Sequence, residues 1–529
     1  MFSKMSKTHH NRKAVLIGID GATWSLIKPW IDDGSLPTLR HVLASGVNGT
    51  LTSTVPPYTL PAWTSIFTGV NPGKHGITDI LIKEGDKLIV PSSSHRAVPS
   101  LWKILSTHGL KSIIVNDPVT YPPEHINGIM ITGFLTPPDA ENYVYPPQLK
   151  EEIEEVSEGY LCELPRNYDE AIARDKAKAY EMIQRFGEKT AEVALHLMHN
   201  YDWDVFAVVF TSTDRLQHFY WYDKSCIRGH YAWLDGVIKR FVDAANRLKT
   251  NVFFVSDHGF GPLKRTFYVN TWLRNRGYIN TKKSRFTSFL SKLNITTEGF
   301  VNILKRMRLH KLVSRVTPEK AKNTLPYSGN RQRINKENSV AYLMSPTGGL
   351  EINRDLCKDK EYEEVKSTIV DGLLNIVDDS KKVVDHVYER QDVCWGPYAY
   401  RAPTLFVLPS NGYKLSTETY ASKLFSLPIQ HESQILRTGE HRPEGIFAAY
   451  GPDIKENIEL HNLIQTWDIA PTILHLLGMP IPAYMDGRVL KEIFRKGSEP
   501  ASRLITHFKV SEREKVKAKI KKIKLKSWK

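Results

Sequence analysis

Six aspartate and histidine residues stand at or near the ends of runs that resemble β-strands. They are Asp20, Asp214, His218, Asp257, His258 and His441. The spacing of Asp214 and His218 places both side chains on one face of a helical turn. Carboxylate and imidazole groups are common zinc ligands, and three of them leave a coordination position open for catalysis. Each residue alone indicates a turn or an ordinary histidine more often than a ligand, but together they predict two three-ligand metal sites.

The segment 54–76 adds a candidate hydroxyl nucleophile, Thr59. Pro61 suits the first turn of a helix that runs toward Thr68. A hydroxyl at a helix N-terminus lies next to unpaired backbone N–H groups that can receive a phosphoryl oxygen, and a metal can lower its pKa. Without metal ligands elsewhere, Thr59 would be interpreted only as a helix cap. With them, the segment predicts phosphoryl-transfer chemistry.

The elements that must position these residues alternate between two patterns. Strand-like runs occupy 14–19, 111–116, 128–132, 204–211 and 251–256, and helical patterns occupy 36–44, 99–107, 169–199 and 230–249. This alternation predicts an α/β fold with a mostly parallel central sheet covered by helices on both faces. Active sites in such sheets lie beyond the carboxyl ends of the strands. The six residues are therefore expected at one sheet edge.

The composition is that of a globular protein. The chain has 529 residues, of which 41% are hydrophobic and 24% charged, which excludes wholesale disorder and a small disulfide scaffold. The four cysteines are scattered without a CxxC motif, as in a reducing compartment. No apolar run reaches the ~20 residues of a membrane-spanning helix, and no signal-peptide pattern begins the chain. We expect a cytoplasmic protein, with peripheral membrane contact as a further expectation.

The net charge of +15 is concentrated in two segments. Residues 282–336 hold 14 Lys/Arg and 2 Glu, and residues 502–529 hold 11 Lys/Arg and 2 Glu, which leaves a net charge of −6 for the rest. The basicity therefore belongs to appendages, and nucleic acid is not the expected partner.

The segment 285–316 mixes apolar and basic residues at near-helical spacing. One interpretation is an amphipathic helix on an anionic membrane surface, to which the C-terminal tail would also bind. The other, favoured about two to one, is a cap helix with a solvated basic face. The membrane interpretation would favour a lipid-linked phosphodiester substrate over another small molecule. The oligomeric state is left open.

Several separated motifs, in order, resemble the type I phosphodiesterase/nucleotide pyrophosphatase branch of the alkaline phosphatase superfamily. They are Asp20-Gly21, Thr59-Leu-Pro through Thr68-Gly69 to Pro72-Gly-Lys-His-Gly76, Asp214-Arg-Leu-Gln-His218, Ser256-Asp-His-Gly259, Gly439-Glu-His441, Asp468-Ile-Ala-Pro-Thr-Ile473 and Met485-Asp-Gly-Arg488. The resemblance implies an alkaline-phosphatase-like core with an inserted cap subdomain. Expected boundaries are 1–280 plus 431–498 for the core, 281–338 for a basic insertion, 339–430 for the cap and 499–529 for a basic tail.

The resemblance also implies a ligand set. Asp20, Asp257 and His258 would bind one divalent ion together with the nucleophile Thr59, and a second ion would be bound by three further residues: Asp214, His218 and His441. Zinc is the usual metal of the family, and manganese is the alternative. The implied activity is hydrolysis of phosphodiester or pyrophosphate bonds through a phospho-threonine intermediate.

The chain departs from the family pattern after the nucleophile. Ala62-Trp63 stand where the nucleotide pyrophosphatases have an Asn-His pair, so another donor must hold the phosphoryl oxygen. Candidates are the backbone N–H of Leu60 and, more weakly, Thr64. Nucleotide substrates become doubtful, and the absence of a Cys-x-Pro-x-Arg motif disfavours sulfate esters. A phosphomonoesterase or phosphonate-ester hydrolase on the same site, and a membrane- or nucleic-acid-binding protein with a vestigial metal site, remain the alternatives.

Overall fold

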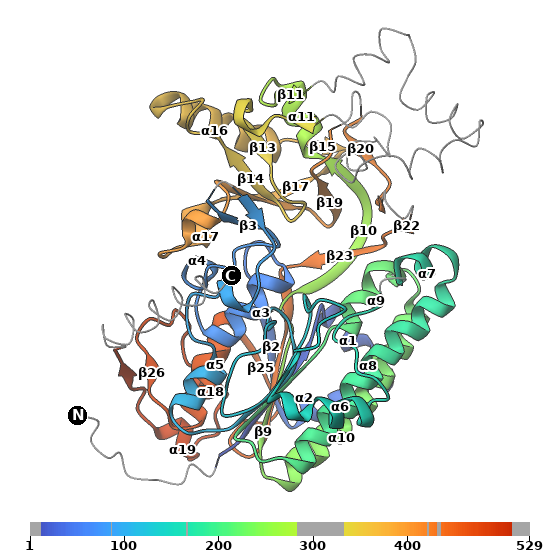
Figure 1. Ribbon diagram of the computed structural model, residues 1–529, viewed down its shortest axis with the longest axis vertical. Helices are drawn as coiled ribbons and strands as arrows, with labels where there is room; N and C mark the ends of the chain where they lie inside the picture. Colours follow the sequence, from blue (N-terminus) through green and yellow to red (C-terminus); the bar gives the residue numbers. More distant parts are fainter. Residues whose placement is uncertain are drawn as a thin grey trace. The chain divides into compact units, whose positions relative to one another are not determined.

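The computed structural model describes residues 12–85, 87–165, 168–282, 333–419, 423–430 and 435–509 (Figure 1). The chain divides into two compact units. The first comprises Met1–Gly261, Gln391–Ala402 and His441–Lys529, and the second comprises Pro262–Arg390 and Pro403–Glu440.

A nine-stranded sheet forms the centre of the first unit. In spatial order its strands are β25 (Ile458–Gln465), β2 (Gly46–Thr52), β24 (Glu444–Tyr450), β9 (Asn251–Val255), β1 (Ala14–Ile19), β8 (Val205–Phe210), β5 (Ser112–Asp117), β6 (Gly128–Thr132) and β7 (Val144–Tyr145). The five strands from β9 to β6 run parallel, whereas β24 and β7 are antiparallel to their neighbours. The predicted α/β fold with a mostly parallel sheet is confirmed.

The central strands are buried on both faces. Every residue of β1 and β8 is buried, as expected for strands with helices above and below. On one face Leu16 and Val209 belong to a hydrophobic cluster with residues of α3 (Thr59–Thr68), α5 (Leu101–Thr107) and α18 (Ile469–Leu476). On the other face Phe206 and Phe210 contact Phe241 of α10 (Lys224–Arg247). Figure 1 shows these two helical layers on opposite sides of the sheet.

One predicted helix is divided in the structure. The pattern over 169–199 predicts a single helix, but the chain forms α7 (Tyr168–Arg174) and α8 (Lys176–Asn200). Asp175 between them has an extended backbone with φ of −149°, and its side chain accepts a hydrogen bond from the Lys178 N–H. A capping aspartate starts a new helix here, so the prediction of one continuous helix was wrong.

The second unit has its own hydrophobic cluster. Its four-stranded antiparallel sheet has the order β13 (Ala341–Leu343), β14 (Gly349–Ile352), β18 (Leu405–Pro409) and β17 (Val384–Glu389). Helix α16 (Asp359–Leu374) contributes Tyr362, Ile369 and Leu373 to the cluster.

The units differ from the expected boundaries in two ways. Residues 262–280 and 435–440 fall inside the expected core but belong to the second unit, and residues 391–402 fall inside the expected cap but belong to the first unit. Within that unit the Trp395 N–H donates to Asn71 Oδ1 at 3.1 Å, and Arg401 Nη1 donates to the Gly76 carbonyl at 3.1 Å. These contacts join residues more than 300 positions apart in sequence, which composition and periodicity do not reveal.

The segment 285–316, for which a cap helix and a membrane-surface helix are the two interpretations, and the tail beyond residue 509 lie outside the described residues. Among the described helices, none combines the length and the apolar character that crossing a membrane requires.

Candidate metal centre and nucleophile

The sheet topology brings the predicted ligands to one edge. Asp20 directly follows β1. Asp257 and His258 follow β9 after one intervening residue, Ser256, and α9 (Ser212–Tyr220), which carries Asp214 and His218, follows β8. These three strands are parallel neighbours. His441 precedes β24, which is antiparallel to β9, so the start of β24 lies at the same edge. Strand β2 is antiparallel to β24 and therefore ends there too, ahead of Thr59.

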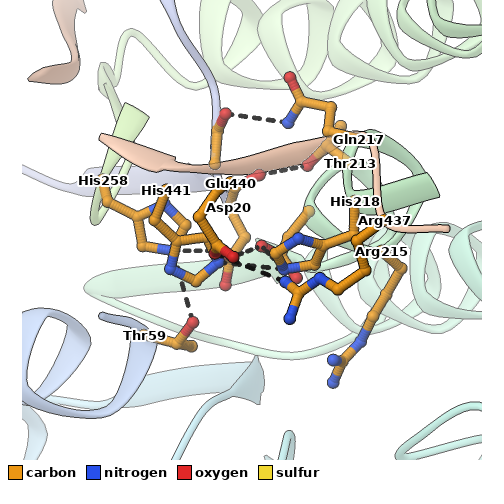
Figure 2. A network of polar contacts seen from close by, with 12 residues as sticks. Asp20, Thr59, Thr213, Arg215, Gln217, His218, His258, Arg437, Glu440 and His441 are labelled. Carbon is orange, nitrogen blue, oxygen red and sulfur yellow. Dashed lines mark hydrogen bonds and ion pairs between the residues drawn. The ribbon is translucent and has the colours of Figure 1, made fainter. Parts of the chain in front are cut away.

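Asp20, Asp257 and His258, here called the first triad, converge around one point. His258 Nε2 lies 3.3 Å from Asp257 Oδ2 and 3.5 Å from Asp20 Oδ1, and Thr59 Oγ1 is also 3.5 Å from His258 Nε2 (Figure 2). Ligand atoms bound about 2.0–2.1 Å from a tetrahedral ion are about 3.3–3.4 Å apart. The spacing therefore matches the ligand shell of one small divalent ion.

The buried atoms of the first triad need a cation. His258 Nδ1 lies 3.0 Å from the Gly259 carbonyl and donates to it, which leaves a lone pair on Nε2. That lone pair faces Asp20 Oδ1 and Asp257 Oδ2, which are buried and have no hydrogen-bond donor among the described residues. Unpaired acceptors of this kind are costly in a protein interior. A divalent ion between them would satisfy all three atoms, so the residues present fit a metal.

Asp214, His218 and His441, here called the second triad, are as closely spaced. His441 Nε2 lies 3.0 Å from Asp214 Oδ1 and 3.1 Å from His218 Nε2, and His218 Nε2 lies 3.4 Å from Asp214 Oδ1. His441 Nδ1 is 3.2 Å from the Pro57 carbonyl, to which it donates. Its Nε2 is therefore the nitrogen that faces Asp214 and His218 and would bind a metal held by this triad. The two triads adjoin, since the rings of His258 and His441 stack with centroids 3.7 Å apart.

The pKa values of the carboxyl groups are shifted in opposite directions in the two triads. Burial, with added repulsion from Asp214, raises the pKa of Asp20 well above its usual value. Burial and the repulsion from Asp20 and Asp214 also raise the pKa of Asp257. Burial opposes ionisation of Asp214 too, but His218 and His441 hold its pKa well below the usual value. Burial and the neighbouring His441 lower the pKa of His258, which keeps that imidazole neutral and able to bind a metal.

Thr59 is the first residue of α3, as predicted. The preceding Tyr58 makes no side-chain cap, and the first N–H groups of a helix have no partner within it. The backbone N–H of Leu60 is therefore placed to donate to a phosphoryl oxygen. The Thr64 hydroxyl, by contrast, donates to the Leu60 carbonyl at 2.7 Å. Its hydrogen is engaged within the helix, so this contact does not support Thr64 as a phosphoryl donor.

Three further side chains support the centre and were not among the predicted site residues. Thr213 donates to the Asp20 carbonyl at 2.6 Å, and Gln217 donates to the Gly21 carbonyl at 2.9 Å. The i, i+4 spacing of these two residues repeats that of Asp214 and His218 one position earlier, which is a signal in the sequence. The indole of Trp63 donates to Asp20 Oδ2 at 3.0 Å, and this contact depends on how α3 packs on β1.

Comparison with known proteins gives a consistent picture. Residues 14–434 match the family model described as type I phosphodiesterase/nucleotide pyrophosphatase. Murine ectonucleotide pyrophosphatase/phosphodiesterase 5, an inactive threonine-to-alanine variant in complex with AMP, is 11% identical with a TM-score of 0.51, over 92% of this chain and 100% of that one. Phosphonoacetate hydrolase from Sinorhizobium meliloti 1021 in complex with phosphonoformate is 14% identical with a TM-score of 0.53, over 88% and 95%. At these identities the structures show a shared fold.

A curated relative matches over a short stretch. A Caenorhabditis elegans homolog of the extracellular sulfatase Sulf-1 is 45% identical over 47 residues, which is 9% of this chain and 7% of that protein.

Proposed function

This chain belongs to the type I phosphodiesterase/nucleotide pyrophosphatase family of hydrolases that act on phosphorus esters, and we propose that it cleaves phosphodiester or pyrophosphate bonds through a phospho-threonine intermediate on Thr59. The observation that carries this proposal is the convergence of the two triads at one sheet edge, with the Thr59 hydroxyl 3.5 Å from His258 Nε2.

The chain supplies a nucleophile, a hydrogen-bond donor and the charged side chains of the two triads. Thr59 Oγ1 would attack phosphorus, forming a Thr59 O–P bond while the bond to the leaving-group oxygen breaks and the proton of the Thr59 hydroxyl is passed on to that oxygen. The Leu60 N–H and the positive end of the α3 dipole would stabilise the phosphoryl oxygen on which charge builds up. A water would then attack phosphorus from the vacated side, breaking the Thr59 O–P bond and restoring the hydroxyl.

The divalent ions of this family fit the two triads, and we propose zinc in both sites. When bound, they would lower the pKa of the Thr59 hydroxyl and offset negative charge on the attacking and leaving oxygens. The first triad with Thr59 offers three oxygens and one nitrogen, and the second offers one oxygen and two nitrogens. Nitrogen-containing tetrahedral sets favour zinc over magnesium or calcium, while manganese remains the alternative metal.

Two related structures support the proposed chemistry. The murine phosphodiesterase is described as inactive when one threonine is replaced by alanine, and it was solved with AMP. The bacterial hydrolase was solved with phosphonoformate. Together they motivate testing diesters and phosphonates side by side. A phosphonate-ester hydrolase is therefore the second candidate function, and a phosphomonoesterase the third.

A substrate panel tests the proposal. The full-length protein, loaded with zinc or with manganese, is assayed with an aryl phosphodiester, the matching monoester, an aryl phosphonate ester, a nucleoside triphosphate and a phospholipid. We expect kcat/KM for the aryl diester to exceed that for the matching monoester. A diester-to-monoester ratio of kcat/KM below one would favour the phosphomonoesterase. A kcat/KM for the phosphonate ester above both values would favour the phosphonate-ester hydrolase. Turnover of the lipid alone would support the lipid-linked substrate that the membrane interpretation of 285–316 favours.

A further inference from the structure

The helix that carries the nucleophile also donates a hydrogen bond to a proposed metal ligand. Trp63 lies one turn after Thr59 on α3, and its indole N–H donates to Asp20 Oδ2 at 3.0 Å. Resting on the proposed function, we infer that Trp63 is a positioning residue: it holds Oδ2 of Asp20, so that Oδ1 faces the metal, and it ties the carboxylate to the helix of the nucleophile.

The indole leaves Asp20 with one oxygen for a metal. Oδ2 is occupied by Trp63, while Oδ1 is buried, has no partner among the described atoms and lies 3.5 Å from His258 Nε2. Asp257 is arranged similarly, because its Oδ1 accepts from the Gly21 N–H at 3.4 Å and its Oδ2 is the unpaired atom. Each carboxylate of the first triad is thus held through one oxygen and presents the other. Such outer contacts orient ligands and raise metal affinity.

The indole cannot easily move away from Asp20. It lies across β1 at Gly18, where an added Cβ would be 2.3 Å from Trp63 Cη2. It also stacks on Phe67 with ring centroids 5.9 Å apart. Trp63 is fully buried. Only a glycine two residues before Asp20 allows α3 to approach β1 closely enough for this hydrogen bond.

The placement of Trp63 couples two parts of the centre. Residues four apart on a helix lie on the same face, so Thr59 and Trp63 move together with α3. A shift of this helix would displace the nucleophile and the Asp20 carboxylate as one body. The distance between the attacking oxygen and the first metal site is therefore kept by a single helix.

Trp102 provides a matched control. It is fully buried in the same hydrophobic cluster, it contacts Phe67 with centroids 5.0 Å apart, and its indole donates to Glu124 Oε1 at 2.7 Å. Both buried tryptophans therefore donate an indole hydrogen bond to a carboxylate, but Glu124 belongs to neither triad. A role in packing alone predicts similar consequences for the two tryptophans.

The test compares Trp63→Phe with Trp102→Phe in the full-length protein. Each variant is stripped with a chelator and titrated with zinc by calorimetry, and kcat and KM are then measured for the best substrate of the panel. For Trp63→Phe we expect one of the two zinc ions to bind 10- to 100-fold more weakly, with kcat falling by a similar factor and KM changing by less than about threefold. For Trp102→Phe both zinc affinities and kcat should stay within about threefold of wild type, whatever its loss in Tm.

Gly18→Ala perturbs the same hydrogen bond without changing the indole. If one of the two variants fails to fold, the other still tests the inference. Gly18→Ala should weaken binding of the same zinc ion. If Trp63→Phe and Gly18→Ala bind both zinc ions as wild type does, and only Tm falls, the inference is wrong. The zinc titration tests it even when no panel substrate is hydrolysed. A wild-type protein that binds fewer than two zinc ions would instead refute the proposed function.

Discussion

The two triads hold the same kinds of side chain but differ in electrostatics. The first has two carboxylates and one neutral imidazole, all at most 1% exposed, and burial raises the pKa of Asp20 and Asp257. The second has one carboxylate and two imidazoles at 5–8% exposure, and its imidazoles lower the pKa of Asp214. The second triad thus balances part of its own charge, whereas the first depends on a cation. We therefore expect the first site to dominate both activity and the link between metal and stability.

Removing one ligand from each triad gives the largest contrast. Asp257→Asn should abolish binding of the first ion and lower kcat/KM by at least about 10³-fold, because Thr59 would lose its activating ion. His218→Asn should release only the second ion. Elemental analysis of the dialysed proteins counts the ions that remain bound in each variant. Loss of both ions in both variants would show that the triads are not separate sites.

Metal removal should reveal a difference in stability between the same sites. Chelation should lower the Tm of the wild-type protein, since an ion present at about 1,000 times its Kd stabilises the fold by about 4 kcal/mol. The decrease in Tm on chelation should be smaller in Asp257→Asn than in His218→Asn. The reason is that the amide removes a buried charge that otherwise destabilises the metal-free protein. Thermal denaturation with and without chelator measures both losses. Equal losses in the two variants would argue against the electrostatic distinction.

The pH dependence of the metal-free protein should show the smallest effect. Because the pKa of Asp257 is raised on folding, its charge destabilises the folded state at neutral pH, and this penalty fades as pH falls toward about 4. Metal-free Asp257→Asn should therefore be more stable than metal-free wild type at pH 7 and converge with it at lower pH.

For Asp214 the charged carboxylate stabilises the folded state, because its pKa is lowered on folding. Its stabilising contribution is present above about pH 4 and is lost only as pH falls further, through the folded pKa. Metal-free Asp214→Asn should be less stable than metal-free wild type at pH 7, with the gap closing below pH 4. Differences in Tm between each variant and wild type isolate these groups from the other histidines. A shared sign for the two variants would contradict the comparison.

The sequence was sufficient to predict the proposed ligands that stand next to strands. Asp20, Asp257 and His258 directly follow short apolar runs, and the i, i+4 spacing joins Asp214 to His218, so local patterns predicted that these side chains would meet. His441 is more than 180 residues from the other ligands, and the family motif rather than periodicity identified it.

What the sequence did not reveal depends on tertiary packing. The hydrogen bond from Trp63 to Asp20 requires α3 to approach β1 at Gly18, and no local pattern encodes that distance. The division of the long predicted helix depends on the Asp175 side chain capping α8, a choice that apolar periodicity does not register. Residues 391–402 join the first unit through isolated contacts of Trp395 and Arg401.

The most direct test of the account is the turnover of Thr59→Ala with its metal content measured on the same sample. The two-ion centre with a threonine nucleophile predicts that this variant keeps close to two ions per chain and loses at least about 10³-fold in kcat. Turnover within a few-fold of wild type, with both ions bound, would contradict the assignment of Thr59 as the group that attacks phosphorus.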